Sequence, residues 1–300
     1  MTAIHLSAFS YELGDPHSIS ELGDEAAAEQ PPSNQGLANY LVSHQEIRQL
    51  AKTVCKRTLE QSSKAPDLIV YVSENDRRID DSLARIASEI GLPAVRYLAV
   101  SGHGCGNLVP ALLVVRDALS SGRHDRILLV FADRALDGER QMLSGLSVFS
   151  DGAAACMVTG EPEDAAGCQA KVTALTTRTQ VEIGPEQLAG QSLLTMVELA
   201  TAAVADILRD TGCARADFGH VLFPNYRMGS QKFLTTAMGL PPQQLLAGPV
   251  GELGHCFSAD ILITLAMYTA SGRLRPGDRL LASATGTYSW SIMAVEITRS

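Results

Sequence analysis

Two passages of the sequence repeat each other, one in each half of the chain. Residues 104–134 and 254–284 each begin with a glycine followed by a reactive side chain, Cys105 in the first passage and His255 in the second. Each continues through an apolar stretch and a Ser-Gly-Arg turn into a strand-like run led by an arginine. Repeats of this kind indicate that one supersecondary unit occurs twice. We therefore expect two related halves, with a nucleophile from one half and a base from the other.

Strand and helix patterns alternate along the rest of the chain. The expected strands cover 3–11, 67–73, 95–100, 126–132, a run ending at 158, 171–181, 219–223, 278–284 and 290–297. The expected helices cover 44–62, 79–91, 187–211, 229–238 and the stretches after Cys105 and His255, while 14–36 has a loop composition. Continuously apolar strands indicate that helices cover both sheet faces. With the repeat, this predicts an α/β, five-layered α-β-α-β-α sandwich, divided into halves 1–165 and 166–300.

Composition excludes several classes of function. The net charge is −9 and no dense basic cluster occurs, so nucleic-acid binding is not expected. The six cysteines show no paired spacing of the kind that holds a metal. There is no signal-peptide pattern, and the longest apolar stretch, near 259–270, is too short to span a bilayer. We expect a reduced, cytoplasmic compartment and no contact with a membrane.

Cys105 is the candidate nucleophile. It lies between two glycines at a strand-to-helix turn, where the backbone can bend sharply and approach a substrate closely. The start of the following helix is expected to lower the pKa of the thiol and so favour the thiolate, which attacks acyl thioesters. The alternative is a small packing cysteine at a tight turn, and the repeat favours the functional interpretation.

Four further positions are candidates for the site. His255, at the matching turn of the second half, can donate a hydrogen bond to a thioester carbonyl or move a proton. Asn225, at a strand end, can hold a water or a carbonyl oxygen or orient His255. His103 is two residues before Cys105, on the same side of an extended backbone, and is a candidate pocket residue. The N–H of Gly286 is a candidate for one half of an oxyanion hole, with the N–H of Cys105.

The chain resembles the thiolase superfamily, and within it the β-ketoacyl-acyl-carrier-protein synthase III branch. The resemblance rests on the Cys-Gly turn and its helix (105–119), FSDGAAACMV (149–158), VLFPNYR (221–227), GELGHCFSADILITLAM (251–267) and RPGDRLLASATGTYSWSIMAVEI (275–297). It implies a thiolase-like fold, a homodimer and a catalytic set of Cys105, Asn225 and His255. Relative to that branch, Asn and His have exchanged places. The second, C-terminal cysteine of thiolases is absent, which argues against thiolase chemistry.

The resemblance implies an acyltransferase that loads an acyl group from a thioester onto Cys105. The acyl group would then pass to an acceptor, either by decarboxylative condensation or by direct transfer that forms a C–O or C–N bond. Coenzyme A or an acyl-carrier protein would carry the substrate thioester, no cofactor would be permanently bound, and the setting would be fatty-acid-like or polyketide metabolism. A non-catalytic partner subunit of a ketosynthase-like heterodimer is a further alternative, although such subunits usually lack the cysteine.

Overall fold

The structure is a computed structural model that describes residues 3–22, 36–142, 145–165, 167–181, 193–286 and 288–299. The α-helices of this part are α2 (Ile47–Gln61), α3 (Ile79–Glu89), α4 (Leu108–Ser120), α5 (Leu193–Thr211), α6 (Met228–Ala237), α7 (Val250–Leu253) and α8 (Asp260–Ala270). The strands are β1 (Ile4–Leu13), β2 (Asp15–Ser18), β3 (Asn39–Val42), β4 (Leu68–Val72), β5 (Arg96–Val100), β6 (Arg126–Asp133), β7 (Gly152–Thr159), β8 (Gln169–Thr179), β9 (His220–Leu222), β10 (Arg279–Gly286) and β11 (Ser289–Arg299). The 3-10 helices are η1 (Ile19–Leu22), η2 (Gly104–Gly106), η3 (Arg215–Asp217), η4 (Pro242–Gln244) and η5 (Phe257–Ala259).

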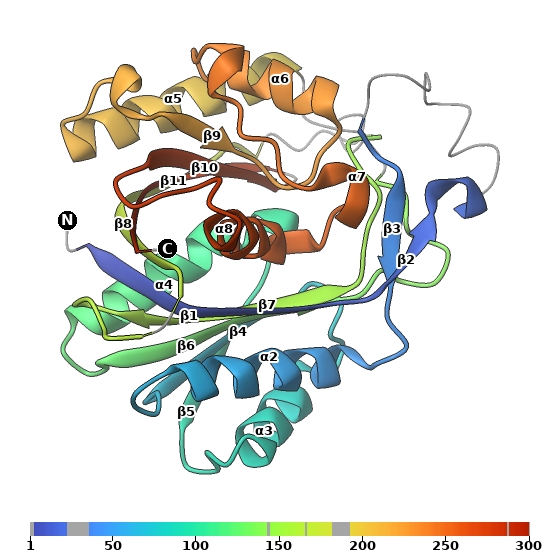
Figure 1. Ribbon diagram of the computed structural model, residues 1–300, viewed down its shortest axis with the longest axis vertical. Coiled ribbons are helices and arrows are strands. Elements are labelled where there is room, and N and C mark those ends of the chain that lie inside the picture. Colours follow the sequence, from blue (N-terminus) through green and yellow to red (C-terminus); the bar gives the residue numbers. More distant parts are fainter. Residues whose placement is uncertain are drawn as a thin grey trace.

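The elements stack in the five layers expected from the sequence (Figure 1). Helices α5 and α6 cover strands β8, β9, β10 and β11, while α2 and α3 cover β4, β6 and β7 on the opposite side. Helices α4 and α8 lie in the middle, between the two groups of strands. The α-β-α-β-α sandwich is therefore confirmed.

The sequence repeat is also a repeat of topology. Nine strands of the described part join in the order β5-β4-β6-β7-β1-β8-β11-β10-β9. In the first half, β1 pairs with β7 and β7 with β6, both antiparallel, while β6 and β4 are parallel. In the second half β8, β11, β10 and β9 pair in the same senses, and the halves meet where β1 pairs with β8. The division of the chain at 165 and 166 stays a prediction.

The second half departs from the repeat at one edge of the sheet. In the first half β5 continues the sheet beyond β4 as a parallel strand. At the matching place beyond β9, the described chain makes a single parallel bridge between Val221 and Leu245. The N–H of Leu246 donates to the carbonyl of Val221 at 2.9 Å, which occupies the outer side of β9. The edge strand of the second half is thus reduced to one point of contact.

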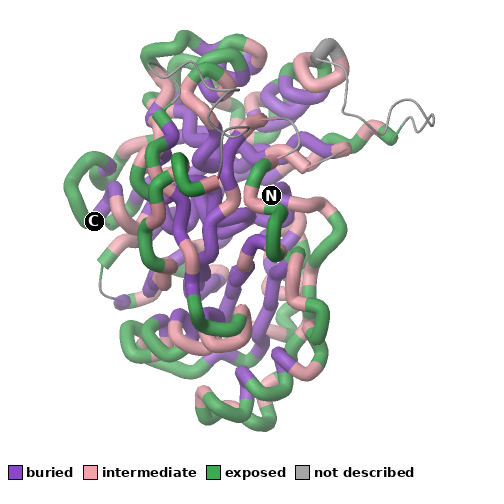
Figure 2. The backbone as a smooth tube through the Cα atoms, turned by 90° about the vertical axis from the view of Figure 1, so that its right-hand side faces the viewer, coloured by how far each residue is buried: buried purple, intermediate pink, exposed green. Residues whose placement is uncertain are grey.

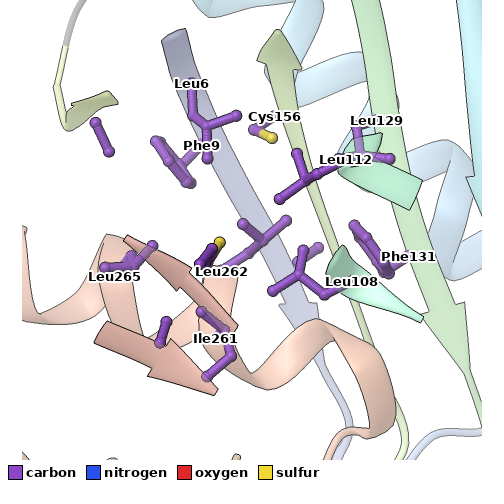
Figure 3. Packing of buried hydrophobic residues seen from close by; sticks show 14 of the residues in the cluster. Leu6, Phe9, Leu108, Leu112, Leu129, Phe131, Cys156, Ile261, Leu262 and Leu265 are labelled. Carbon is purple, nitrogen blue, oxygen red and sulfur yellow. The ribbon is translucent and has the colours of Figure 1, made fainter. Parts of the chain in front are cut away.

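The largest core cluster lies around the middle layer. Leu108 and Leu112 of α4 and Ile261, Leu262 and Leu265 of α8 belong to this cluster, together with side chains of the first-half strands β1 and β6 (Figure 3). Figure 2 shows that buried residues run through the interior and exposed residues lie at the periphery. A helix that is apolar on nearly every side, as α8 is after its first residue, is stable only when it is buried on all sides. This requirement places α8 between the two groups of strands.

The 14–36 segment, whose composition predicts a loop, contains a strand. Asp15–Ser18 forms β2, which pairs antiparallel with β3. Its polar sequence carries no strand pattern because backbone pairing with β3, rather than burial of its own side chains, holds it in place. Residues 23–35 of that segment and residues 187–192 of the expected helix 187–211 lie outside the described residues.

A buried carboxylate fixes the loop that follows β4. Oδ1 of Asp133 accepts hydrogen bonds from the hydroxyl of Ser73 at 2.8 Å, the N–H of Glu74 at 2.8 Å and the N–H of Asn75 at 2.9 Å. Asp133 ends β6, the neighbour of β4, so a single side chain sets the backbone path where the two strands end. Burial raises the pKa of Asp133 to about 8.

The Asp133→Ala variant is expected to lose about 2–4 kcal/mol of unfolding free energy, since it leaves buried donors without an acceptor. Asp133→Asn keeps an acceptor oxygen and should lose less. An unfolded Asp titrates near pH ~4, and the folded-state value lies near 8. The folded chain therefore binds more protons between these values, so the stability from this group falls as pH rises through that range. Urea unfolding at several pH values should show that fall in wild type and its absence in Asp133→Asn.

Candidate active site

Cys105 lies in the 3-10 turn η2, just before the central helix α4. Its side chain is 8% exposed and packs with Ala135 and Phe257. Asn107 steadies the turn, since its side-chain amide donates to the carbonyl of Gly104 at 2.6 Å and its Oδ1 accepts from the N–H of His103 at 3.2 Å. The structure therefore places the candidate nucleophile at a nearly buried turn directed toward the start of a helix.

The Cys105 turn touches the end of β10. A Cβ atom on Gly106 would lie 2.9 Å from the amide nitrogen of Gly286, a distance that real side chains essentially never show. Only glycine at Gly106 permits this approach of the two backbones. The N–H groups of Cys105 and Gly286 consequently lie in the same small region, as the oxyanion-hole prediction requires. That role stays a prediction.

The Cys105 thiol is not activated by its surroundings alone. Burial raises its pKa well above the ordinary value, and the carboxylates of Glu74, Asp133 and Asp260 raise it further. The sequence-based expectation of a lowered pKa is therefore wrong. The N-terminus of α4 favours the thiolate of Cys105, but burial and the three nearby carboxyl groups favour the thiol more strongly. Cys105 rests as a thiol and requires a base to become a nucleophile.

His255 is fully buried and held by its backbone. Its N–H donates to the carbonyl of Val148 at 2.9 Å, and its carbonyl accepts from the N–H of Ser150 at 2.8 Å. Around the imidazole, the Phe149 ring stacks at 5.7 Å between centroids, the Phe257 ring at 6.0 Å, and the edge of Tyr226 approaches at 5.3 Å. These aromatic rings leave the imidazole little freedom to rotate.

Asp260 holds the imidazole from one side. Its Oδ2 lies 2.5 Å from Nδ1 of His255, and Asp260 itself is 1% exposed. With Nδ1–H donating to the carboxylate, the other ring nitrogen is left as the proton acceptor. This Nε2 atom is buried and has no hydrogen-bond partner among the described residues. A buried imidazole with one nitrogen fixed and the other unpartnered is suited to take a proton from a nearby group.

Asn225 reaches His255 through Asp260. Its backbone N–H donates to Oδ2 of Asp260 at 2.7 Å, and its side-chain amide donates to Oδ1 at 3.5 Å. Asn225 is fully buried, and its carbonyl accepts from the hydroxyl of Ser147 at 2.6 Å. Of the alternatives for Asn225, these contacts fit the orientation of His255 rather than a direct contact with Cys105.

Cys105 and His255 belong to one site. Phe257 packs against Cys105 and stacks near the His255 ring. The hydroxyl of Ser258 donates to the carbonyl of Gly104 at 3.3 Å, which joins the two turns directly. The turns of the two duplicated passages are therefore in contact, and a joint role of Cys105 and His255 stays a prediction.

His103 is placed differently from the expectation. The backbone at residues 103–105 is not extended, because Gly104 has a φ of +55° and starts a 3-10 turn. Nδ1 of His103 lies 3.5 Å from the hydroxyl of Ser289 on β11. The expected shared side with Cys105 is therefore wrong, and His103 is not among the residues that line the adjoining cavity.

A cavity of about 510 Å³ adjoins the nucleophile. Gly104, Glu74 and Phe257 form its boundary next to Cys105, and Phe149 and Glu139 are also part of its lining. Phe257 has a φ of +52°, a strained value for a residue with a side chain, and its ring stacks on Phe149 at 4.5 Å. The strained turn orients an apolar wall between the cavity and the imidazole.

Two residues of the site were not predicted from the sequence. Asp260 is the lone charge in an apolar helical stretch five residues after His255, and this isolation was a usable signal. Glu74 follows a buried strand in the polar run Ser-Glu-Asn-Asp, where nothing marks one residue above the others. In the structure the thiol of Cys105 donates to Oε2 of Glu74 at 3.6 Å.

The described residues contain no group of three or more His, Cys, Asp or Glu side chains arranged to hold a metal ion. Within the same ranges, no helix has both the length and the apolar character needed to cross a membrane.

Comparisons with known proteins agree with this geometry. Residues 208–297 match the family model for the C-terminal part of 3-oxoacyl-[acyl-carrier-protein] synthase III. β-Ketoacyl-[acyl-carrier-protein] synthase III 2 of Streptomyces coelicolor is 26% identical over 250 residues, which cover 76% of this chain and 72% of the relative. Among solved structures, the acyltransferase ChlB3 has a TM-score of 0.82 at 20% identity, over 99% of this chain and 98% of that one.

A solved 3-oxoacyl-(acyl carrier protein) synthase III, FabH of Pseudomonas aeruginosa, has a TM-score of 0.81 at 18% identity and covers 99% of both chains. The two structural likenesses concern the fold, while the family model and the curated relative are matches of sequence. The structural likenesses agree with the duplicated topology of the chain. The chain therefore has the thiolase-like fold of FabH, and its C-terminal part is similar in sequence to the β-ketoacyl-[acyl-carrier-protein] synthases III.

Proposed function

We propose that this protein is a cysteine acyltransferase that uses His255, held by Asp260, as its base. The observation that carries the proposal is the 2.5 Å contact between Nδ1 of His255 and Oδ2 of Asp260, which leaves a buried and unpartnered Nε2 in the site of Cys105. A nucleophile, a base and a third group that orients the base are the parts that covalent acyl transfer needs. Asn225 is a positioning residue that acts through Asp260.

The first half-reaction acylates Cys105. Nε2 of His255 takes the thiol proton, which the raised pKa of Cys105 would otherwise retain at neutral pH. The thiolate attacks the carbonyl carbon of an acyl thioester, and the N–H groups of Cys105 and Gly286 stabilise the oxyanion. The incoming thioester loses its thiolate, which takes the proton from His255. Coenzyme A and an acyl-carrier protein both remain donors compatible with this step.

Direct transfer is favoured over decarboxylative condensation. Condensation requires free donors for the enolate oxygen of a malonyl thioester, but Nδ1 of His255 and the side-chain amide of Asn225 are both directed at Asp260. A base held by a carboxylate suits the activation of an acceptor hydroxyl, amine or thiol. The fold that the chain shares with the acyltransferase ChlB3 is consistent with this assignment.

A non-catalytic partner subunit is the remaining alternative. Such a subunit has no use for a nucleophile beside an oriented imidazole.

A homodimer is proposed through the edge strand β5. This strand is partly exposed, with Tyr97 46% exposed, whereas its neighbour β4 is buried. The pathway is proposed to be fatty-acid-like or polyketide metabolism in the cytoplasm.

Incubation with acyl-CoA thioesters of increasing chain length should add one acyl group to the intact protein by mass spectrometry. Cys105→Ala should gain no mass, since no other side chain of the site is a comparable nucleophile. Cys256→Ala serves as the matched control, because this fully buried neighbour of His255 takes no part in the proposed step. An acyl adduct that persists in Cys105→Ala would assign the nucleophile elsewhere.

Asp260→Asn should reduce the rate of acylation by on the order of 10³-fold, because an amide cannot hold the same imidazole tautomer. The backbone N–H groups of Asn225 and Cys256 donate to different oxygens of Asp260, so Asn retains an acceptor for only one of them, and circular dichroism must first confirm that the variant is folded. Stopped-flow or quenched-flow mass measurements give the rate. A folded variant with wild-type acylation kinetics would contradict the role of Asp260.

The acylated protein should release no CO₂ from a malonyl thioester above the level of Cys105→Ala. Nδ1 of His255 and one N–H of the Asn225 side-chain amide are directed at Asp260, which leaves fewer donors for the enolate of the malonyl group. Radiolabelled malonyl-CoA provides the measurement. Release of CO₂ at the rate of deacylation would restore condensation as the reaction.

A further inference from the structure

Glu74 lies between the nucleophile and the cavity. Its Oε2 accepts from the thiol of Cys105 at 3.6 Å, and a Cβ atom on Gly104 would lie 2.8 Å from its Oε1. The bond from its backbone N–H to Asp133 fixes the position of the Glu74 backbone. Glu74 also lines the cavity and is exposed to solvent. Its carboxyl is therefore accessible to a molecule in the cavity and in contact with the thiol of Cys105.

The cavity is acidic. Among the described residues, Glu74 and Glu139 are its charged lining side chains, and none of the lining residues is basic. Arg134 and Arg140, which flank the lining segment 136–139 in the chain, are directed at the buried Asp151 instead. Both side chains are exposed, and their like charges create a negative potential at the lining that attracts cations and repels anions.

This charge discriminates among acceptors of the acyl group. A malonyl or other anionic acceptor meets like charge beside Cys105, whereas a neutral hydroxyl meets only a hydrogen-bond acceptor. A protonated amine gains an ion pair with Glu74 at the position from which it attacks. Burial raises the pKa of Glu74, which makes its carboxylate a better proton acceptor for a bound ammonium group.

We infer that Glu74 binds a protonated primary amine as the acceptor and removes its first proton, so that the acyl group is transferred to nitrogen. The inference rests on the proposed acylation of Cys105 and names the substrate class of the second half-reaction. Glu139 contributes to the attraction at the outer part of the cavity and has no direct role at the reacting atoms.

In the transfer step, the Glu74 carboxylate takes one proton from R–NH₃⁺, which leaves a lone pair on nitrogen. This pair attacks the carbonyl carbon of acyl-Cys105, the C–N bond forms, and the C–S bond breaks as the tetrahedral intermediate collapses. His255 takes the second proton from nitrogen and delivers it to the Cys105 thiolate. Glu74 returns its proton to solvent, so the products are an amide, the free thiol and one proton.

The transfer experiment uses acyl-Cys105 enzyme and three four-carbon acceptors, namely butylamine, butanol and 4-hydroxybutyrate. Loss of the acyl mass and formation of product are followed by mass spectrometry. Glu74→Gln should slow transfer to butylamine at least tenfold and transfer to butanol less than threefold, since only the amine uses the charge. Asp137→Asn, an exposed carboxylate of the same loop as Glu139 and outside the cavity lining, should change neither rate by more than twofold.

A binding experiment on the free protein separates this inference from the proposed function. Saturation-transfer NMR should detect butylammonium, but not butyrate, on wild type and Asp137→Asn, and neither on Glu74→Gln. If thioesters fail to acylate Cys105 while butylammonium binds through Glu74, the proposed function falls and the amine site stands. If Cys105 is acylated but Glu74→Gln leaves amine binding unchanged, or slows amine and alcohol transfer equally, the inference is overturned and the proposed function stands.

Discussion

The site depends on one buried carboxylate at the start of a helix. Asp260 is the first residue of α8, which is otherwise apolar and packed on nearly all sides in the middle layer. A lone charge at that depth is costly unless it is paired. It is stabilised here by the start of the helix, by two backbone N–H donors and by the imidazole. The packing of the central layer and the orientation of the base therefore rest on the same group.

Cys105 has two carboxyl groups near it, Asp260 and Glu74, which differ in their exposure to solvent. Asp260, on the side of the base, is buried, and its carboxylate contacts the imidazole of His255. Glu74, on the other side, lines the cavity and contacts the thiol itself. Burial and both carboxylates raise the pKa of Cys105. The resting group is therefore a thiol, and the proposed reaction requires a base that takes its proton.

The sequence predicted the layered fold because its information was redundant. The two copies of one unit and the strands that are apolar along their whole length indicated the same architecture. Cys105 and His255 were singled out because glycine and the repeat mark their turns, whereas Asn225 was singled out by the resemblance to a known family. Asp260 and Glu74 were missed, since their roles arise from which distant side chains they meet. The pKa of Cys105 was misjudged for the same reason: the helix start is local and visible, whereas the burial and the three carboxylates are tertiary.

The unequal edges of the sheet limit how copies of this chain can associate. In the described part, β5 presents an open edge, while the outer side of β9 is met by the chain at Leu245 and Leu246. Strand addition needs a free row of backbone groups on both participants. Two chains that join β5 to β5 use the same surface twice, which closes the pair about a two-fold axis. The outer side of β9, where Val221 already accepts from Leu246, lacks the free row of backbone groups that head-to-tail strand addition would need.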